Sequence, residues 1–189
     1  MTPAGIPAPP RRLIGLVGPP GVGKSTLAAR LADADSTAAV LPMDGFHYSQ
    51  ARLRELGRRE RMGAQDTFDV EGFGRVLREL RSEAFVTAPG FDRSIEEPVT
   101  GAITIGRGIL TVYVEGNYLL VWPGIAELLD ETWYLELDSE VRRRRLLERH
   151  VATGKTPDAA AAWISDVDEP NARLIAASAA GATRTVAVD

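Results

Sequence analysis

Cysteine is absent from this 189-residue sequence, and lysine is nearly absent. Without cysteine, the chain cannot form disulfides, zinc–thiolate sites, iron–sulfur clusters or cysteine nucleophiles. It carries 20 arginines but only two lysines, Lys24 and Lys155. It also lacks an apolar run long enough to span a membrane. The scarcity of lysine makes the positions of Lys24 and Lys155 informative.

The charge balance gives little reason to expect a polyanionic partner. The formal net charge is −4, so binding to nucleic acid or to an anionic membrane surface is not expected, and a small-molecule partner fits better. The proline-rich residues 1–12 lack the apolar core of a signal peptide and predict a flexible tail before a single domain at 13–189. We expect a cytoplasmic protein, for which a homodimer is compatible with the sequence.

Short apolar runs alternate with segments of helical periodicity. This alternation is typical of an α/β three-layer domain with a mainly parallel, five-stranded sheet. The polar stretch 91–98 has little periodicity and predicts a loop. The predicted strands are 13–17, 38–41, 109–114, 132–137 and 185–188, and the predicted helices are 24–35, 52–61, 70–81, 139–151 and a region from 158.

A glycine-rich loop follows the first predicted strand. Residues 18–25 match the pattern G-x-x-x-x-G-K-S/T, for which we expect roughly 0.002 accidental matches at this composition. Glycine-rich backbone can wrap phosphates with its N–H groups, and the following helix points its positive dipole end at the same anion. Lys24 would reach the β and γ phosphates, and Ser25 would offer its hydroxyl to Mg²⁺. The predicted nucleotide-binding residues are Gly18, Pro19, Pro20, Gly21, Val22, Gly23, Lys24, Ser25 and Thr26.

Two acidic residues stand at the ends of predicted strands. Asp44 follows 38–41, at the sheet edge where open α/β folds bind ligands. A carboxylate there can accept the proton of an attacking hydroxyl, although an aspartate before glycine also suits a simple turn. Glu115 ends the most hydrophobic run, where an ionised group persists only beside a partner or a metal. It is a candidate ligand for Mg²⁺, with a solvated strand-end glutamate as the alternative.

Arginines gather on the predicted helix at 139–151. Arg142, Arg145 and Arg149 are three and four residues apart and therefore share one helix face. This face can present guanidinium groups to phosphates, or it can be an ordinary solvated basic face. Lys155 lies in the break that follows the helix.

Six motifs together resemble those of one known family. They are GPPGVGKST at 18–26, PMDGFHYS at 42–49, TFDVEGF at 67–73, PGFDRSIEEP at 89–98, VYVEGNYLL at 112–120 and DEPNARLI at 168–175. In this combination the chain resembles the P-loop kinases that comprise uridine kinase, phosphoribulokinase and bacterial pantothenate kinase. It looks most similar to a branch of nucleoside/nucleotide kinase-like proteins that includes fructose-transport-system kinases. The resemblance implies a three-layer P-loop NTPase fold with a helical lid, and MgATP as the phosphoryl donor.

The resemblance also implies roles at the reacting groups. Asp44 matches the family's catalytic base, and Glu115 matches the acid that holds Mg²⁺ together with Ser25. The lid falls on the arginine-rich helix. There Arg145 and Arg149 would assist Lys24 in stabilising the transition state, and Arg142 would bind the nucleotide.

For the acceptor and the base, the resemblance points to loops that relatives use for binding. Arg93 suits an anionic acceptor group, with pairing to Glu96 or Glu97 as the alternative. Asn171 matches the region that flanks adenine. The residues matching the acceptor-site loops are His47, Tyr48, Phe68, Phe91, Asp92 and Arg93.

Two classes of function remain after these considerations. The first is an ATP-dependent kinase acting on a hydroxyl of a nucleoside, a sugar or a pantothenate-like metabolite. The second is a nucleotide-hydrolysing switch, which is disfavoured because the sequence has no N-K-x-D and its D-x-x-G at 69–72 opens a helical segment. The chain has Asp-Gly-Phe-His at 44–47 where uridine kinases have Asp-Ser-Phe-Tyr, which puts uridine in doubt as the acceptor.

Overall fold

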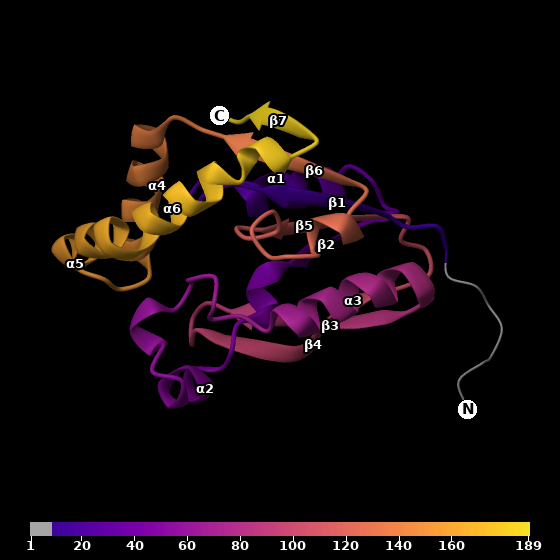
Figure 1. Ribbon diagram of the computed structural model, residues 1–189, viewed down its shortest axis with the longest axis horizontal. Coiled ribbons are helices and arrows are strands. Elements are labelled where there is room, and N and C mark those ends of the chain that lie inside the picture. The colour runs from indigo at the N-terminus through magenta and orange to yellow at the C-terminus, as the bar shows by residue number, and fades with distance from the viewer. Residues whose placement is uncertain (1–8) are drawn as a thin grey trace.

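The computed structural model describes residues 9–189 and contains one five-stranded parallel sheet (Figure 1). The strand order is β2-β5-β1-β6-β7, and all four pairings are parallel. This confirms the expected three-layer fold, with every strand within two residues of its predicted bounds. The strands are β1 (Arg12–Val17), β2 (Ala38–Pro42), β5 (Thr111–Gly116), β6 (Glu131–Glu136) and β7 (Arg184–Ala187).

Side chains of β1 alternate between two hydrophobic cores, one on each face of the sheet. Leu13 and Val17 belong to the larger core, which α3 (Val70–Ser82) covers. Ile14 and Leu16 belong to the smaller core, which α1 (Lys24–Asp33) covers. Successive residues of a strand point to opposite faces, so a strand that is apolar throughout is buried on both. The apolar run at 13–17 therefore had to lie between two helical layers.

The arginine-rich helix and its neighbours lie together at one end of the sheet. Figure 1 shows α4 (Ser139–Ala152), α5 (Pro157–Trp163) and α6 (Glu169–Ala177) at the end opposite the N-terminal side of the molecule. A π-helical turn, η4 (Ile164–Asp168), joins α5 to α6. These helices, together with α1 and α3, confirm the predicted helices at 24–35, 70–81 and 139–151 and the helical region from 158.

The prediction of a loop at 91–98 was wrong. Residues 91 and 92 end β3 (Val86–Asp92), 97 and 98 begin β4 (Glu97–Ile105), and the two strands form an antiparallel hairpin outside the main sheet. The outer strand β4 is largely exposed, so burial imposes no alternation on its sequence. A register shift between Ala88 and Gly90 further hides the period of two. Only the tip, 93–96, is a loop.

The prediction of a helix over 52–61 was also wrong in extent. The helix α2 (Gln50–Glu55) stops before Gly57, which has a φ of 65° and ends it in the left-handed conformation, and a separate short 3-10 turn (Arg59–Arg61) follows. Residues 1–8 of the expected tail lie outside the described part of the chain.

The end of the expected tail instead belongs to the fold, because Arg12 begins β1 and Arg11 is buried. The Arg11 guanidinium donates hydrogen bonds to the backbone oxygens of Leu80, Glu83, Ala84, Gly106 and Ile109. Within residues 9–189, none of the helices is both long and apolar enough to cross a bilayer.

Candidate active site

Three segments of the chain meet at the carboxyl ends of adjacent strands. The strand β5 lies between β1 and β2, and Glu115 is paired in register with Leu16 on one side and Pro42 on the other. The loop 18–25 leaves the end of β1, and Asp44 follows the end of β2. The order of the strands therefore brings these three segments together, as expected for the ligand-binding edge of an open α/β sheet.

The glycine-rich loop is shaped by its left-handed glycines and by contact with α4. Gly21 and Gly23 have φ values of 81° and 101°, which side chains rarely adopt. A Cβ on Gly21 would lie 2.8 Å from Leu146 Cγ, so the loop packs directly against α4. Gly23 caps the N-terminus of α1, which begins at Lys24. The loop thus has the strand-loop-helix form that a phosphate site requires.

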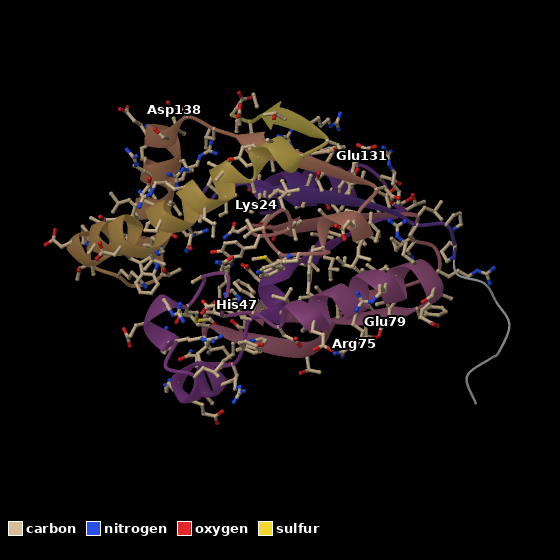
Figure 2. The ribbon with its side chains drawn as sticks, in the orientation of Figure 1. Lys24, His47, Arg75, Glu79, Glu131 and Asp138 are labelled. Atoms are coloured by element: carbon tan, nitrogen blue, oxygen red, sulfur yellow. The ribbon has the colours of Figure 1, made fainter. Side chains whose placement is uncertain are left out.

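Lys24 is buried inside this loop. Its Nζ donates to the backbone oxygens of Gly18 at 2.8 Å and Pro19 at 3.1 Å. Burial lowers the pKa of Lys24 to about 8, and the nearby carboxylates of Glu115 and Asp44 only partly offset this effect. The ammonium group is therefore held in a desolvated position where an added anion would stabilise its charge. Figure 2 labels Lys24 on the sheet side and His47 on the hairpin side of the site.

Glu115 and Ser25 are hydrogen-bonded to each other. The Ser25 hydroxyl donates to Glu115 Oε1 at 3.1 Å, and Glu115 is buried at the end of β5. Burial and the nearby Asp44 raise the pKa of Glu115, while Lys24 and the bond from Ser25 act in the opposite direction. A hydroxyl and a carboxylate thus converge beside the loop, a pair of oxygen ligands that suits Mg²⁺ when phosphate oxygens and waters complete its coordination.

Asp44 lies in a short 3-10 helix, η1 (Met43–Phe46), that is wedged between β5 and the hairpin. On one side, a Cβ on Gly116 would lie 2.7 Å from Met43 Cβ. On the other, a Cβ on Gly45 would lie 2.1 Å from the Pro89 oxygen in β3. No side chain fits at Gly45, which explains in packing terms why glycine occupies this position. Asp44 Oδ2 accepts a hydrogen bond from Arg93 Nη2 at 2.5 Å.

Aromatic rings lie beside Asp44. The His47 ring centroid is 3.8 Å from that of Phe68 and 4.9 Å from that of Phe91, which ends β3 with Asp92. His47 Nδ1 lies 2.9 Å from the Asp44 backbone oxygen. Burial lowers the pKa of His47 despite the opposing influence of Asp44, so the ring is mostly neutral near pH 7. Three of the predicted acceptor residues are therefore packed together.

The remaining predicted acceptor and adenine residues have different surroundings. The backbone N–H of Tyr48 donates to the Thr67 oxygen at 3.0 Å. The Asp92 carboxylate accepts hydrogen bonds from the backbone N–H and hydroxyl of Ser94, which lower the pKa of Asp92 and fix the hairpin tip. Asn171 is half-buried on α6, where no side-chain hydrogen bond links it to another described residue.

Arg142 differs from the other arginines of α4 because its side chain is only 5% exposed. Its guanidinium pairs with Glu169 and donates to the Pro20 backbone oxygen at 3.3 Å. Burial alone would raise the pKa of Glu169, but hydrogen bonds from Arg142 and Arg143 outweigh it and hold that pKa low. Arg142 thus ties the back of the glycine-rich loop to α6.

Arg145 and Arg149 are more exposed than Arg142. Arg145 Nη1 lies 3.8 Å from the position of a Cβ on Gly23, and its Nη2 donates to the Asp189 backbone oxygen at 2.7 Å. Arg149 has no ion pair with another described residue, and desolvation followed by repulsion from Arg93 lowers its pKa. Both guanidinium groups can therefore turn toward an anion.

Sequence reasoning missed several residues that support the site. Glu169 holds Arg142, and Asp168 Oδ2 lies 2.8 Å from His150 Nε2, so the acids of the DEPN sequence fix α6 and η4 against α4. The only indication in the sequence that these two acids matter was that both belong to the motif at 168–175. Lys155 Nζ lies 4.9 Å from the centroid of the Trp163 ring, which places it against α5.

An open hollow of about 470 Å³ adjoins the glycine-rich loop on the side away from the hairpin. It is bounded by Pro19 and by the carboxyl ends of β6 and β7. The lining residues include Tyr134, Leu137, Asp138, Ala187 and Val188.

Comparison with known proteins finds kinases. No family model matches the chain. An ATP-dependent kinase-like protein, notR', of Aspergillus versicolor is 39% identical over 133 residues, covering 64% of this chain and 77% of that protein. A candidate uridine kinase of Schizosaccharomyces pombe is 37% identical over 160 residues, covering 76% and 68% respectively.

Solved structures agree with these relatives. The crystal structure of a candidate fructose transport system kinase from Silicibacter sp. TM1040 superposes with a TM-score of 0.88 at 37% identity, covering 98% of this chain and 93% of that one. The YFH7 protein of Saccharomyces cerevisiae, described as a P-loop kinase candidate, shares the fold with a TM-score of 0.83 at 18% identity. The chain belongs to the P-loop kinases of the uridine kinase, phosphoribulokinase and bacterial pantothenate kinase family.

Proposed function

We propose that the protein transfers the γ-phosphoryl group of ATP to a hydroxyl of a small metabolite of the nucleoside, sugar or pantothenate type. In this reaction the acceptor oxygen forms a bond to Pγ as the bond between Pγ and the β–γ bridging oxygen breaks. ADP leaves with the electron pair of that bond, and the hydroxyl proton passes to Asp44. Such transfers depend mainly on positioning and electrostatic stabilisation.

The observation that carries this proposal is the meeting of Asp44 with the glycine-rich loop and Glu115. The Asp44 carboxylate is close enough to raise the pKa values of both Lys24 and Glu115. It also stands on η1, which Met43 packs against Gly116 at the end of β5. An acid that served only as a turn residue would not need this placement. A base beside the γ-phosphate position does need it.

On the nucleotide side, each element of the loop has a proposed role. Backbone N–H groups of residues 21–25, which follow the two prolines of the loop and include the N-terminus of α1, would surround the phosphates. Lys24 would exchange its bonds to Gly18 and Pro19 for phosphate oxygens, and Arg145 and Arg149 would add charge from α4. The hollow beside Pro19 offers room for the base.

Mg²⁺ is the metal that the oxygen ligands at this site suit. Ser25 and Glu115 would hold it directly or through water, leaving its other positions to phosphate oxygens and waters. When bound, the ion neutralises charge on the phosphates that develops during transfer. Arg142 is proposed as a positioning residue that fixes the loop through Pro20, since its guanidinium is already paired with Glu169.

The direct test is a screen of ATP consumption against nucleosides, sugars, sugar phosphates and pantothenate, with the product identified by mass spectrometry. Replacing the proposed base, Asp44→Asn, should lower kcat about 100-fold or more while leaving nucleotide binding in place. Asp33→Asn is a matched control, because Asp33 is exposed at the far end of α1. A D44N variant that retains wild-type kcat would remove Asp44 as the base.

The same screen separates the kinase from a nucleotide-hydrolysing switch. A switch would release inorganic phosphate without forming any phosphorylated small molecule, and a partner protein would stimulate that release. Asp69, the first residue of D-x-x-G, caps the N-terminus of α3 by accepting a hydrogen bond from the Gly72 N–H at 2.9 Å. This placement away from the end of any main-sheet strand favours the kinase.

A further inference from the structure

Arg93 is the one cation of the hairpin tip that reaches Asp44. It is the first residue after β3, and its Nη2 donates to Asp44 Oδ2 at 2.5 Å. The Arg93 side chain is 57% exposed, whereas that of Asp44 is 25% exposed. The contact therefore joins an exposed guanidinium to the carboxylate that our proposed function uses as the base. One of the two carboxylate oxygens of Asp44 is occupied before any acceptor arrives.

The two acids that follow Arg93 in the hairpin, Glu96 and Glu97, have other partners. Glu96 pairs with Arg59 at 2.7 Å, and Glu97 accepts from the Gln50 backbone N–H at 3.3 Å. Gln50 Nε2 also donates to the Ile95 oxygen at 2.7 Å, so α2 and the 3-10 turn after it hold the tip from one side. The structure thus excludes the pairing of Arg93 with Glu96 or Glu97 in this state. Arg93 is left to face the site.

The backbone of the tip has an uncommon conformation at Glu96, three residues after Arg93. Glu96 has a φ of 51°, a left-handed conformation that is uncommon for a residue other than glycine, asparagine or aspartate. Strain of this kind persists only where surrounding contacts hold it, here the ion pair with Arg59 and the bonds from Gln50. Asp92 fixes the other end of the tip through Ser94. Hydrogen bonds and an ion pair therefore fix both ends of the turn that carries Arg93.

Arg93 adds a third cation to a site that already contains Lys24 and Arg149. Its charge lowers the pKa values of both groups, which means that it repels them in the absence of ligand. The neighbouring His47 ring adds no further positive charge, because burial lowers its pKa and the ring is mostly neutral near pH 7. Lys24 lies in the phosphate loop and Arg149 on α4, whereas Arg93 stands on the hairpin beside Phe91 and His47. The third cation is therefore on the acceptor side.

We propose that Arg93 selects acceptors that carry a carboxylate or phosphate group, and that binding of this anion withdraws Arg93 from Asp44. The inference rests on the proposed kinase function and names the substrate class of that site. A guanidinium binds either anion through paired N–H donors. Because one arginine spans the distance between the anion and Asp44, the reacting hydroxyl and the anion lie a few bonds apart. A neutral acceptor would leave Arg93 on the base.

The test compares acceptors that differ only in charge. The pairs are glycerate with glycerol, ribose 5-phosphate with ribose, and pantothenate with its alcohol, each assayed for ATP-dependent product formation. We expect the wild type to favour the anionic member of the productive pair by at least about tenfold in kcat/KM. The three pairs also distinguish a carboxylate from a phosphate as the recognised anion.

The variant Arg93→Gln should reverse this preference. It should raise KM for the anionic acceptor about 10- to 100-fold and increase turnover of the neutral partner, because Asp44 is then no longer paired. KM for ATP should stay unchanged. Arg107→Gln is the matched control, since Arg107 is an exposed arginine just beyond the other end of β4. Urea unfolding of each variant establishes that the fold is intact.

Two results would overturn the inference while leaving the kinase in place. One is equal or better use of the neutral acceptor by the wild type, with the ratio unchanged in R93Q. The other is a rise in KM for ATP in R93Q with acceptor KM unaltered, which would assign Arg93 to the triphosphate. If no member of any pair is phosphorylated and a partner protein stimulates hydrolysis instead, the proposed function itself fails, and this inference fails with it.

Discussion

The close approach of η1 to the hairpin makes Gly45→Ala an informative variant. A Cβ at this position would lie 2.1 Å from the Pro89 oxygen and 2.7 Å from the Pro89 carbonyl carbon. Since carbon and oxygen atoms that are not bonded keep about 3 Å apart, η1 must move from β3 by about 1 Å. Overpacking of this kind lowers the free energy of unfolding by about 1 to 3 kcal/mol.

The same displacement should also affect catalysis, because η1 carries Asp44. A misplacement of about 1 Å lowers a rate by about 100-fold, so kcat should fall by that order while KM for ATP changes little. Urea unfolding measures the first effect, and product formation with the acceptor identified in the screen measures the second. Gly108→Ala is the control, because an added Cβ there meets nothing within 4 Å. Wild-type stability and kcat in G45A would refute the packing argument.

Two further predictions concern charges that the fold buries. Because burial lowers the pKa of free Lys24 to about 8 and bound phosphate requires its ammonium form, ATP affinity should be constant below that pH and fall by up to about tenfold per pH unit above it. Calorimetry in buffers of different ionisation enthalpy should detect proton uptake on ATP binding near pH 8. An affinity that does not change with pH would contradict the role of Lys24 as the ammonium group that binds phosphate. Glu169→Ala leaves the buried guanidinium of Arg142 without its carboxylate and should lower the free energy of unfolding by about 3 kcal/mol in urea, whereas exposed Glu140→Ala should change it by less than about 0.5 kcal/mol.

Local sequence pattern was enough for the parts of the site that are local. The glycine-rich loop needs left-handed residues and a helix start at fixed spacing, and Gly21, Gly23 and Lys24 supply them within one turn of chain. Short apolar runs followed by turn residues predict the strand that ends with Glu115 and the edge strand that precedes Asp44. These features follow from properties of single segments, and the structure places them as expected.

The long-range pairings could not be predicted in the same way. Arg93 pairs with an acid 49 positions away although three acids lie within four residues of it, because Ser94, Arg59 and the Gln50 N–H hold those three acids. Within the run 142–145, only Arg142 is buried, and its partner Glu169 is 27 positions away. In each case the outcome depends on which side chains compete for a partner in three dimensions. The partner of each arginine therefore could not be predicted from one sequence.

The position of β5 between β1 and β2 has a consequence for how the chain folds. The strands β1 and β2 do not pair with each other. Each pairs with β5, which begins at Thr111. The hydrogen bond between Ser25 and Glu115 spans 90 positions, and closing so long a loop is slow compared with forming a helix or hairpin. A chain released from synthesis before residue 111 would carry the complete glycine-rich motif yet lack the strand that supports it. We therefore expect nucleotide binding only after β5 has joined the sheet beside β1.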